Sequence, residues 1–209
     1  PELNARSRVL EIGPLHRFTD YQELSGAQVE ALCIDELNRN FTDTLGIPLH
    51  VCDISRAAPP LEKESFDCIL FCEVLEHFDI APQFAIRTVM SLLKKGGCIL
   101  FSVPNFASIQ KRMLLLRGGN PQDTLSPIVT YFAHIREPVC AETRAWWTDA
   151  GAVITGEGFT NYDKEEPGGV LSKLFWTARF LKIRNWYGLC HIWFPRTRRY
   201  FYLLLRKPV

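Results

Sequence analysis

Seven short apolar runs recur along the 209-residue chain, and they constrain its fold more than any other feature. Most are continuously apolar rather than alternating, which is typical of strands covered by helices on both faces of a parallel sheet. Each run ends in polar or turn residues, and the stretches between them can hold helices. The pattern therefore predicts an α/β fold with a doubly wound, mostly parallel sheet. The runs cover residues 8–12, 29–34, 49–52, 66–71, 98–103, 152–157 and 200–206.

Three of the intervening segments carry helix signals. The clearest helix begins near Pro82, which suits a first helical turn, and reaches Lys94 and Lys95 before two glycines end it. We expect the two lysines to complement the dipole at the helix C-terminus. Two further helices are predicted over residues 107–117 and 141–150.

The length and composition fit one globular domain. A chain of 209 residues supports one full core, and 47% hydrophobic with 22% charged residues is the composition of a folded protein. No apolar run reaches the roughly 18 residues that a membrane-spanning helix needs, and no signal peptide pattern begins at Pro1. We therefore expect a single domain over residues 1–209 in the cytoplasm.

The C-terminal end of the chain is strongly basic. Residues 170–209 contain nine Lys and Arg and no Asp or Glu. Most of this end belongs to a predicted helical insertion at about 162–199. Within it Trp176, Phe180 and Ile183 form an apolar stripe bordered by cations, which favours contact with a membrane interface or a substrate. The alternative is a lid that folds back and buries its own aromatic side chains.

Two residues at strand ends indicate a nucleoside site. The first apolar run ends at Gly13, and in a doubly wound sheet ligands bind at the carboxyl ends of the strands. Asp35 follows Gly13 by 22 residues, and an acidic side chain at about that spacing can accept hydrogen bonds from both ribose hydroxyls. Such endings occur in many α/β proteins, so this pair alone leaves the ligand open.

Later segments narrow the choice. VLEIG, CIDEL, VCDI, FDCILFCEVLEHF, LLKKGGCILFSVPN, HIREP and YLLLRKP occur in the order and spacing of class I methyltransferases of type 11/12, and the chain resembles especially the ubiquinone-biosynthesis O-methyltransferases. The resemblance covers nearly the whole chain. It implies a Rossmann-like seven-stranded sheet whose last strand is antiparallel, and S-adenosylmethionine as cofactor. By similarity, Glu11 and Gly13 would lie at its methionine part, Asp35 at the ribose, Asp53 near the adenine amine and Cys72 near the transferring methyl group.

The loop after the first strand departs from the family pattern. Family members usually read G-x-G-x-G there, whereas this chain reads Gly13-Pro14-Leu15-His16-Arg17. Leu15 and Arg17 stand where glycines would allow close backbone approach to the cofactor, and Pro14 removes a backbone donor. An alternative function is therefore a non-catalytic binding protein with a methyltransferase fold and a degenerate cofactor loop.

Acidic and imidazole side chains gather after the fourth apolar run. Glu73, Glu76 and His77 are spaced to share one face of a helical turn. A similar E-x-x-E-H pattern with a later histidine, here His134, occurs in small-RNA 2′-O-methyltransferases and ubiquinone-type enzymes, where such residues hold a divalent metal. The glutamates could instead simply favour a helix N-terminus, and either histidine could act as general base for a hydroxyl. We assign His77 and His134 as catalytic candidates, rank a divalent metal below that assignment, and leave its ligands unassigned.

The function that these features predict is methyl transfer from S-adenosylmethionine to a hydroxyl or similar nucleophile, with most of the catalysis coming from positioning. The EIGP start resembles methyltransferases of bacterial surface-glycan pathways, which favours a small-molecule, glycan or lipid-linked acceptor and peripheral membrane contact through the basic aromatic segment. An RNA methyltransferase ranks lower, because the basic residues alternate with bulky apolar ones rather than with a recognisable RNA-binding module.

Overall fold

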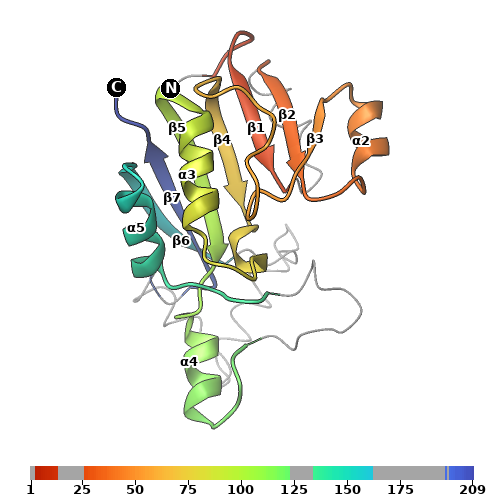
Figure 1. Cartoon of the computed structure of the whole chain (residues 1–209). Coiled ribbons are helices and arrows are strands. Elements are labelled where there is room, and N and C mark those ends of the chain that lie inside the picture. Colours follow the sequence, from red (N-terminus) through yellow and green to blue (C-terminus); the bar gives the residue numbers. More distant parts are fainter. Residues whose placement is uncertain (1–2, 14–25, 123–133, 162–195, 197) are drawn as a thin grey trace, which may run out of the picture.

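A single seven-stranded sheet forms the centre of the computed structural model, which describes residues 3–13, 26–122, 134–161, 196 and 198–209. The strand order is β3-β2-β1-β4-β5-β7-β6 (Figure 1). The predicted insertion at about 162–199 lies almost entirely outside the described residues. The strands are β1 (Arg8–Ile12), β2 (Gln28–Cys33), β3 (Leu49–Val51), β4 (Phe66–Cys72), β5 (Leu93–Pro104), β6 (Val153–Thr160) and β7 (Tyr200–Arg206).

The sheet has the topology that the sequence predicts. β1 to β5 pair in parallel, with β1 at the centre between β2 and β4. β7 runs antiparallel to both of its neighbours, β5 and β6. The chain therefore turns back only at its last strand, and the carboxyl ends of the parallel strands meet at one edge of the sheet.

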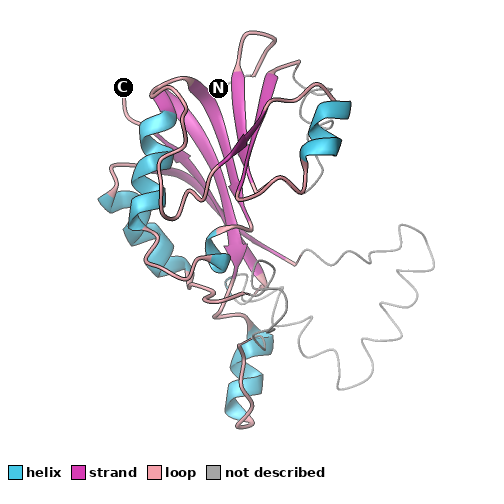
Figure 2. Cartoon of the chain, turned by 45° about the vertical axis from the view of Figure 1, so that its right-hand side comes forward, coloured by secondary structure: helices cyan, strands magenta, loops and turns pink. Residues whose placement is uncertain are grey.

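Helices flank the sheet (Figure 2). α3 and α5 lie on one face, α2 lies beside β3, and α4 projects beyond the edge where the parallel strands end (Figure 1). Among the described residues no helix is long and apolar enough to cross a membrane. The helices are α2 (Arg39–Thr44), the 3₁₀ helix η1 (Leu75–His77), α3 (Gln83–Leu92), α4 (Ile109–Leu116) and α5 (Cys140–Asp149).

The larger core cluster lies between the sheet and helices α3 and α5. Trp147 of α5 is fully buried. Its indole meets the rings of Phe71 and Phe101 with centroids 6.1 and 5.4 Å away. These two phenylalanines come from the central strands β4 and β5. Such tilted and edge-on contacts add to the free energy gained by burying large aromatic surfaces. They anchor β4 and β5 directly beneath the edge where the strands end.

The helix predicted to reach Lys95 ends earlier, at Leu92. Leu93 is fully buried and pairs with Phe66 at the start of β4, so sheet pairing and burial outweigh helix propensity there. Lys94 and Lys95 are both part of β5, and the prediction that they complement the helix dipole was wrong. Lys207 instead takes that role, because its Nζ donates to the carbonyl oxygens of Met90 and Leu93 at 3.0 and 2.8 Å.

Candidate active site

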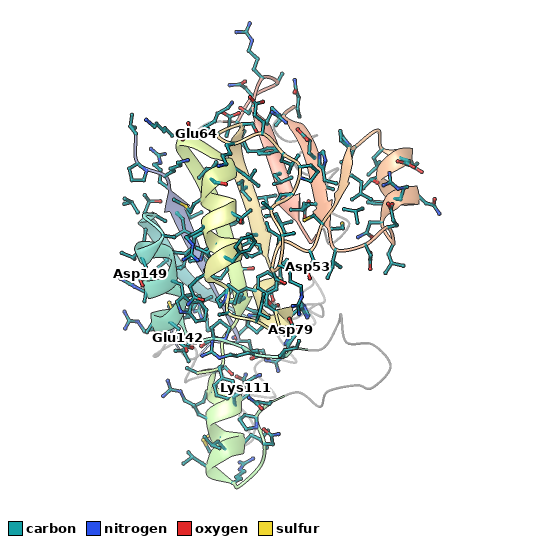
Figure 3. All side chains as sticks on the ribbon, in the orientation of Figure 1. Asp53, Glu64, Asp79, Lys111, Glu142 and Asp149 are labelled. Atoms are coloured by element: carbon teal, nitrogen blue, oxygen red, sulfur yellow. The ribbon has the colours of Figure 1, made fainter. Side chains whose placement is uncertain are left out.

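A cavity of about 880 Å³ opens at the carboxyl ends of β1 to β4. A volume of this order is typical of cofactor and small-molecule sites. In Figure 3, Asp53 and Asp79 mark this edge of the sheet, and Glu64 marks the opposite edge. Among the residues predicted as site residues, the cavity is lined by Gly13, Asp35, Asp53 and His77.

Gly13 follows β1 in a left-handed backbone conformation that favours glycine. Its φ is +65°, and its backbone N donates to the carbonyl oxygen of Leu32 at 2.9 Å. A Cβ at this position would lie 2.4 Å from Cγ2 of Val74. Gly13 thus lets the segment after β4 approach the end of β1. Residues 14–25, which include the rest of the GPLHR loop, lie outside the described part of the chain.

Glu11 and Cys72 flank the cavity rather than line it. Glu11 is buried near the end of β1. Cys72 ends β4 and donates from Sγ to the carbonyl oxygen of Leu100 at 3.5 Å. Burial raises the pKa of the Cys72 thiol to about 11. The thiol is therefore neutral at physiological pH.

Asp35 follows β2 and lies half-buried on the cavity wall. Its Oδ1 accepts a hydrogen bond from the backbone N of Leu37 at 3.0 Å, which closes a turn of the Asx type. This turn holds the carboxylate at the end of the strand. A sugar with two hydroxyls could bind here, as the spacing from Gly13 predicts.

Asp53 belongs to a charged group that spans two strand ends. Its Oδ1 accepts from the backbone N and the Oγ of Ser55 at 3.0 and 2.6 Å. Its Oδ2 lies 3.3 Å from Nε of Arg56. Nη2 of Arg56 also donates to both carboxylate oxygens of Asp79, at 2.6 and 2.5 Å. Sequence reasoning found Asp53 but missed Arg56 and Asp79, because nothing in the pattern pairs the segment after β3 with the segment after η1.

The segment after β4 does not form the helical turn that its spacing predicts. Glu73 has a φ of +55°, and only Leu75–His77 form a short 3₁₀ helix. The prediction that Glu73, Glu76 and His77 share one helical face was therefore wrong. Glu73 is fixed instead by Ser102 of β5, whose Oγ donates to Oε1 at 2.7 Å and whose carbonyl oxygen accepts from the Glu73 backbone N at 2.9 Å.

The two predicted catalytic histidines come together in space. The rings of His77 and His134 pack edge to face with centroids 5.2 Å apart. The segment around His134 is held in place because the backbone N atoms of Ile135 and Arg136 donate to the carbonyl oxygen of Glu76 at 2.8 and 3.1 Å. His77 and Ile135 both line the cavity.

Glu137 forms a hydrogen bond with the ring of His134. Its Oε1 lies 2.9 Å from Nδ1 of His134, and its Oε2 forms an ion pair with Nζ of Lys111 on α4. Burial raises the pKa of Glu137, but the hydrogen bonds from His134 and Lys111 outweigh it and leave the pKa below its ordinary value. An ionised Glu137 orients the His134 ring. Sequence reasoning missed this carboxylate, although it follows His134 by three residues.

Glu76 is the least solvated carboxylate of the site. Its side chain is fully buried, and neither of its oxygens has a hydrogen-bond partner among the described residues. Burial, with the nearby charge of Glu73, raises its pKa well above the ordinary value. Its carboxylate and the ring nitrogens of His77 and His134 offer three ligand atoms within 4.8 Å of one another. This donor set fits a divalent transition metal, which would relieve the cost of the buried carboxylate.

The sheet order, the single antiparallel last strand and the cavity at the strand ends define the class I S-adenosylmethionine-dependent methyltransferase fold. Residues 1–152 match the model of a family described as methyltransferase domain. The chain belongs to this family and is a methyltransferase. The family match favours the enzyme over the non-catalytic alternative. No curated protein sequence matches the chain.

Solved structures share the fold at low sequence identity. A SAM-dependent methyltransferase from Archaeoglobus fulgidus is 14% identical, with a TM-score of 0.65 over 99% of this chain and 89% of its own. One from Mesorhizobium loti is 15% identical, with a TM-score of 0.63 over 99% and 93% of the two chains. Phosphoethanolamine N-methyltransferase 2 from Haemonchus contortus, in complex with S-adenosyl-L-methionine, is 13% identical, with a TM-score of 0.61 over 100% of this chain and 50% of its own.

Proposed function

We propose that this methyltransferase transfers the methyl group of S-adenosylmethionine to a hydroxyl oxygen of a small-molecule, glycan or lipid-linked acceptor. One observation carries the proposal. Asp35, at the position predicted for the ribose, and His77, a candidate base, line the same cavity. S-adenosylmethionine bound with its ribose at one end of this open cavity would face an acceptor held beside His77 in the same cavity.

The residues around the cavity support one orientation of the cofactor. The ribose would bind at the Asp35 turn, and the adenine would lie toward Asp53 and Arg56 at the end of β3. The methionine part would pass Gly13 and Glu11 at the end of β1. Cys72, the last residue of β4, would lie near the transferring methyl group.

The chemistry asks little of the protein beyond alignment and one proton transfer. S-adenosylmethionine supplies a methyl group bound to a sulfonium sulfur. When the methyl group is transferred, the carbon–sulfur bond breaks and the sulfur becomes a neutral thioether. One of the two histidines accepts the acceptor's hydroxyl proton as the oxygen forms its bond to carbon. If His134 is that base, the ionised Glu137 at its Nδ1 stabilises the resulting imidazolium. Holding the acceptor oxygen in line with the sulfonium supplies most of the rate enhancement.

The buried carboxylate favours a metal-assisted version of the same reaction. Glu76, His77 and His134 would hold a divalent cation, with Glu137 orienting one imidazole from outside the ligand set. Such a cation would act as a Lewis acid that lowers the pKa of the acceptor hydroxyl. In this version the protein's own contribution is a fixed set of three ligands beside the cavity.

Calorimetric titration with S-adenosylmethionine and S-adenosylhomocysteine tests the cofactor site. Asp35→Ala should weaken binding by about 1.5–3 kcal/mol, roughly 10- to 150-fold, because a hydrogen-bonded charge is lost. Asp43→Ala, which removes an exposed carboxylate on α2, should leave the affinity unchanged. Equal affinity of the Asp35→Ala variant and the wild type would overturn the ribose assignment.

The acceptor can be found by following the methyl group. The enzyme is incubated with radiolabelled S-adenosylmethionine and a cell extract, which is then separated into polar metabolites, lipids and RNA. We expect the label among glycans or lipid-linked sugars, consistent with an enzyme in the cytoplasm at the membrane surface. Label in a quinone precursor would support the ubiquinone-type resemblance instead, and label in RNA would establish the lower-ranked acceptor.

A further inference from the structure

Helix α4 carries an apolar surface that the rest of the described molecule does not cover. None of its eight residues is buried. Leu114, Leu115 and Leu116 are 44%, 62% and 79% exposed. In Figures 1 and 2 the helix projects away from the sheet, beyond the edge where the cavity opens. We call the exposed residues Arg112, Leu114, Leu115, Leu116 and Arg117 the α4 tip.

The exposed leucines lie in the last turn of α4, and the end of this helix is regularly capped. The backbone N of Gly118 donates to the carbonyl oxygen of Leu115 at 2.9 Å, and that of Gly119 donates to Leu114 at 3.0 Å. With a φ of +76° at Gly118, this is a Schellman motif, which satisfies the last carbonyls of the helix. The backbone therefore stays regular to the end of the helix, and this sets the directions of the Cα–Cβ bonds of the three leucines.

The directions of the three leucines favour one kind of covering surface over another. Successive residues of an α-helix are about 100° apart, so three consecutive leucines point over more than half of the circumference. A single flat protein face would cover one side of the helix and leave the others in water. A fluid apolar medium can surround the end of the helix and cover all three side chains at once.

The charge around the leucines complements an anionic surface. Residues 105–122 contain Lys111, Arg112 and Arg117 and no Asp or Glu. Lys111 is paired with Glu137. Arg112, whose Nε also donates to the carbonyl oxygen of Ala107 at 2.7 Å, and Arg117 are exposed at the two sides of the leucine run. Cations beside an immersed apolar end lie where the headgroups of a bilayer carry their phosphates.

The base of α4 is tied to the active site. Nζ of Lys111 pairs with Glu137, and Glu137 contacts Nδ1 of His134. Figure 3 places Lys111 at the end of α4 nearest the sheet. These two contacts connect the base of α4 to the segment that holds a candidate catalytic histidine.

We propose that the α4 tip docks the enzyme on an anionic lipid membrane, with the three leucines at the headgroup boundary and the two arginines on the phosphates. The docked enzyme presents the edge with the cavity toward the bilayer. This inference does not depend on which acceptor is methylated. It also concerns a different segment from the insertion at about 162–199.

Co-sedimentation of the full chain with vesicles tests the proposal. The wild type should bind vesicles of equimolar phosphatidylcholine and phosphatidylglycerol, bind pure phosphatidylcholine much less, and lose binding as salt rises. Leu115→Ser/Leu116→Ser should weaken binding at least about tenfold. Arg112→Gln/Arg117→Gln should weaken it about 30-fold at low salt.

Matched controls come from the opposite edge of the sheet. Lys63→Gln/Lys95→Gln removes two exposed cations there, and Val209→Ser removes an exposed apolar side chain, so both should bind as the wild type does. All variants should retain the wild-type affinity for S-adenosylhomocysteine, which separates loss of docking from loss of the methyltransferase site or of folding.

Three results would overturn the proposal. The first is a wild type that ignores anionic vesicles. The second is undiminished binding by the leucine variant, with binding lost only in Trp176→Ser/Phe180→Ser. The third is a wild type that self-associates in vesicle-free buffer and becomes monomeric on Leu115→Ser/Leu116→Ser, which would make the tip a contact between copies.

Discussion

His77 and His134 pack edge to face with ring centroids 5.2 Å apart, one on the turn after β4 and the other in the segment before α5. This contact joins two parts of the chain that are distant in sequence, beside the cavity that His77 lines. It also places both imidazoles beside the buried carboxylate of Glu76. A proton acceptor and a metal ligand set therefore share the same few side chains.

Substitution of the histidines should slow methyl transfer without removing the cofactor site. His77→Gln or His134→Gln should lower the rate of S-adenosylhomocysteine formation by about 10²- to 10⁴-fold, the range expected for loss of a general base. Glu137→Gln should cost less, about 10- to 100-fold, because it only disturbs the orientation of His134. His50→Gln, whose ring contacts Glu30 away from the cavity, is the matched control. Full turnover in both active-site histidine variants would exclude them from catalysis.

Metal binding should depend on the buried carboxylate. Calorimetric titration of the metal-free protein with Mn²⁺ or Zn²⁺ should show one site, and Glu76→Gln, which removes a direct ligand, should weaken it by more than the roughly 10- to 100-fold expected for a partner outside the ligand set. Chelation should lower turnover, and added metal should restore it. Glu62→Gln, an exposed change before β4, should alter neither quantity. Identical titrations for Glu76→Gln and the wild type would show that the carboxylate holds no metal.

Gly13 should resist substitution for two separable reasons. Gly13→Ala should cost about 1–2 kcal/mol of unfolding free energy from its left-handed backbone, and about 1–3 kcal/mol more from the overlap with Val74. Gly46→Ala isolates the first contribution, because Gly46 has a φ of +66° and no atom within 4 Å of the added Cβ. Gly13→Ala should therefore lose more unfolding free energy than Gly46→Ala. In urea unfolding, Gly13→Ala made in a Val74→Ala background should lose little more than Gly46→Ala does. If Gly13→Ala and Gly46→Ala are equally destabilised, the close approach of Val74 is not a constraint.

The stability of the fold should fall in acid partly through Asp67. Burial raises the pKa of Asp67, but the hydrogen bonds from Lys94 and from the backbone N of Arg8, with their charges, outweigh it and lower the pKa. Its stabilising contribution is therefore present above the unfolded-state pKa, near 3.9, and is lost as pH falls through the lower folded-state value.

Urea midpoints of the wild type and of Asp67→Asn, measured at about pH 7 and about pH 3, test this assignment. The substitution should destabilise the protein at the higher pH and matter much less at the lower one. Asp149→Asn, an exposed change at the end of α5, should give no such pH-dependent difference. A constant difference between the Asp67→Asn variant and the wild type at both pH values would contradict the assignment.

The strands of this protein could be predicted from sequence because each is a short apolar run with a clear end. β1 and β7 begin and end at the predicted residues. Boundaries failed where long-range pairing decides the conformation, as at Leu93, whose burial against the sheet is not visible in the local pattern. The antiparallel direction of the last strand was implied by the resemblance to methyltransferases rather than by the runs themselves.

The site was predictable where a residue ends a strand and unpredictable where it depends on a partner distant in sequence. Asp35 and His77 follow strands, and both line the cavity. The spacing of Glu73 and His77 suggested a helical face, but the left-handed backbone at Glu73 breaks it. The bridge from Arg56 to Asp79 and the ion pair of Lys111 with Glu137 arise only when separate segments fold together.

The aromatic cluster of Trp147, Phe71 and Phe101 has a consequence for how this enzyme can diversify. It packs α5 against β4 and β5, so the positions of the ends of these strands do not depend on the residues that follow them. Substitutions in the segments after the strands can then change which acceptor is recognised at little cost to the stability of the domain. Mutations that create new specificity should therefore accumulate around His77 and His134 while the residues packed on Trp147 stay constant.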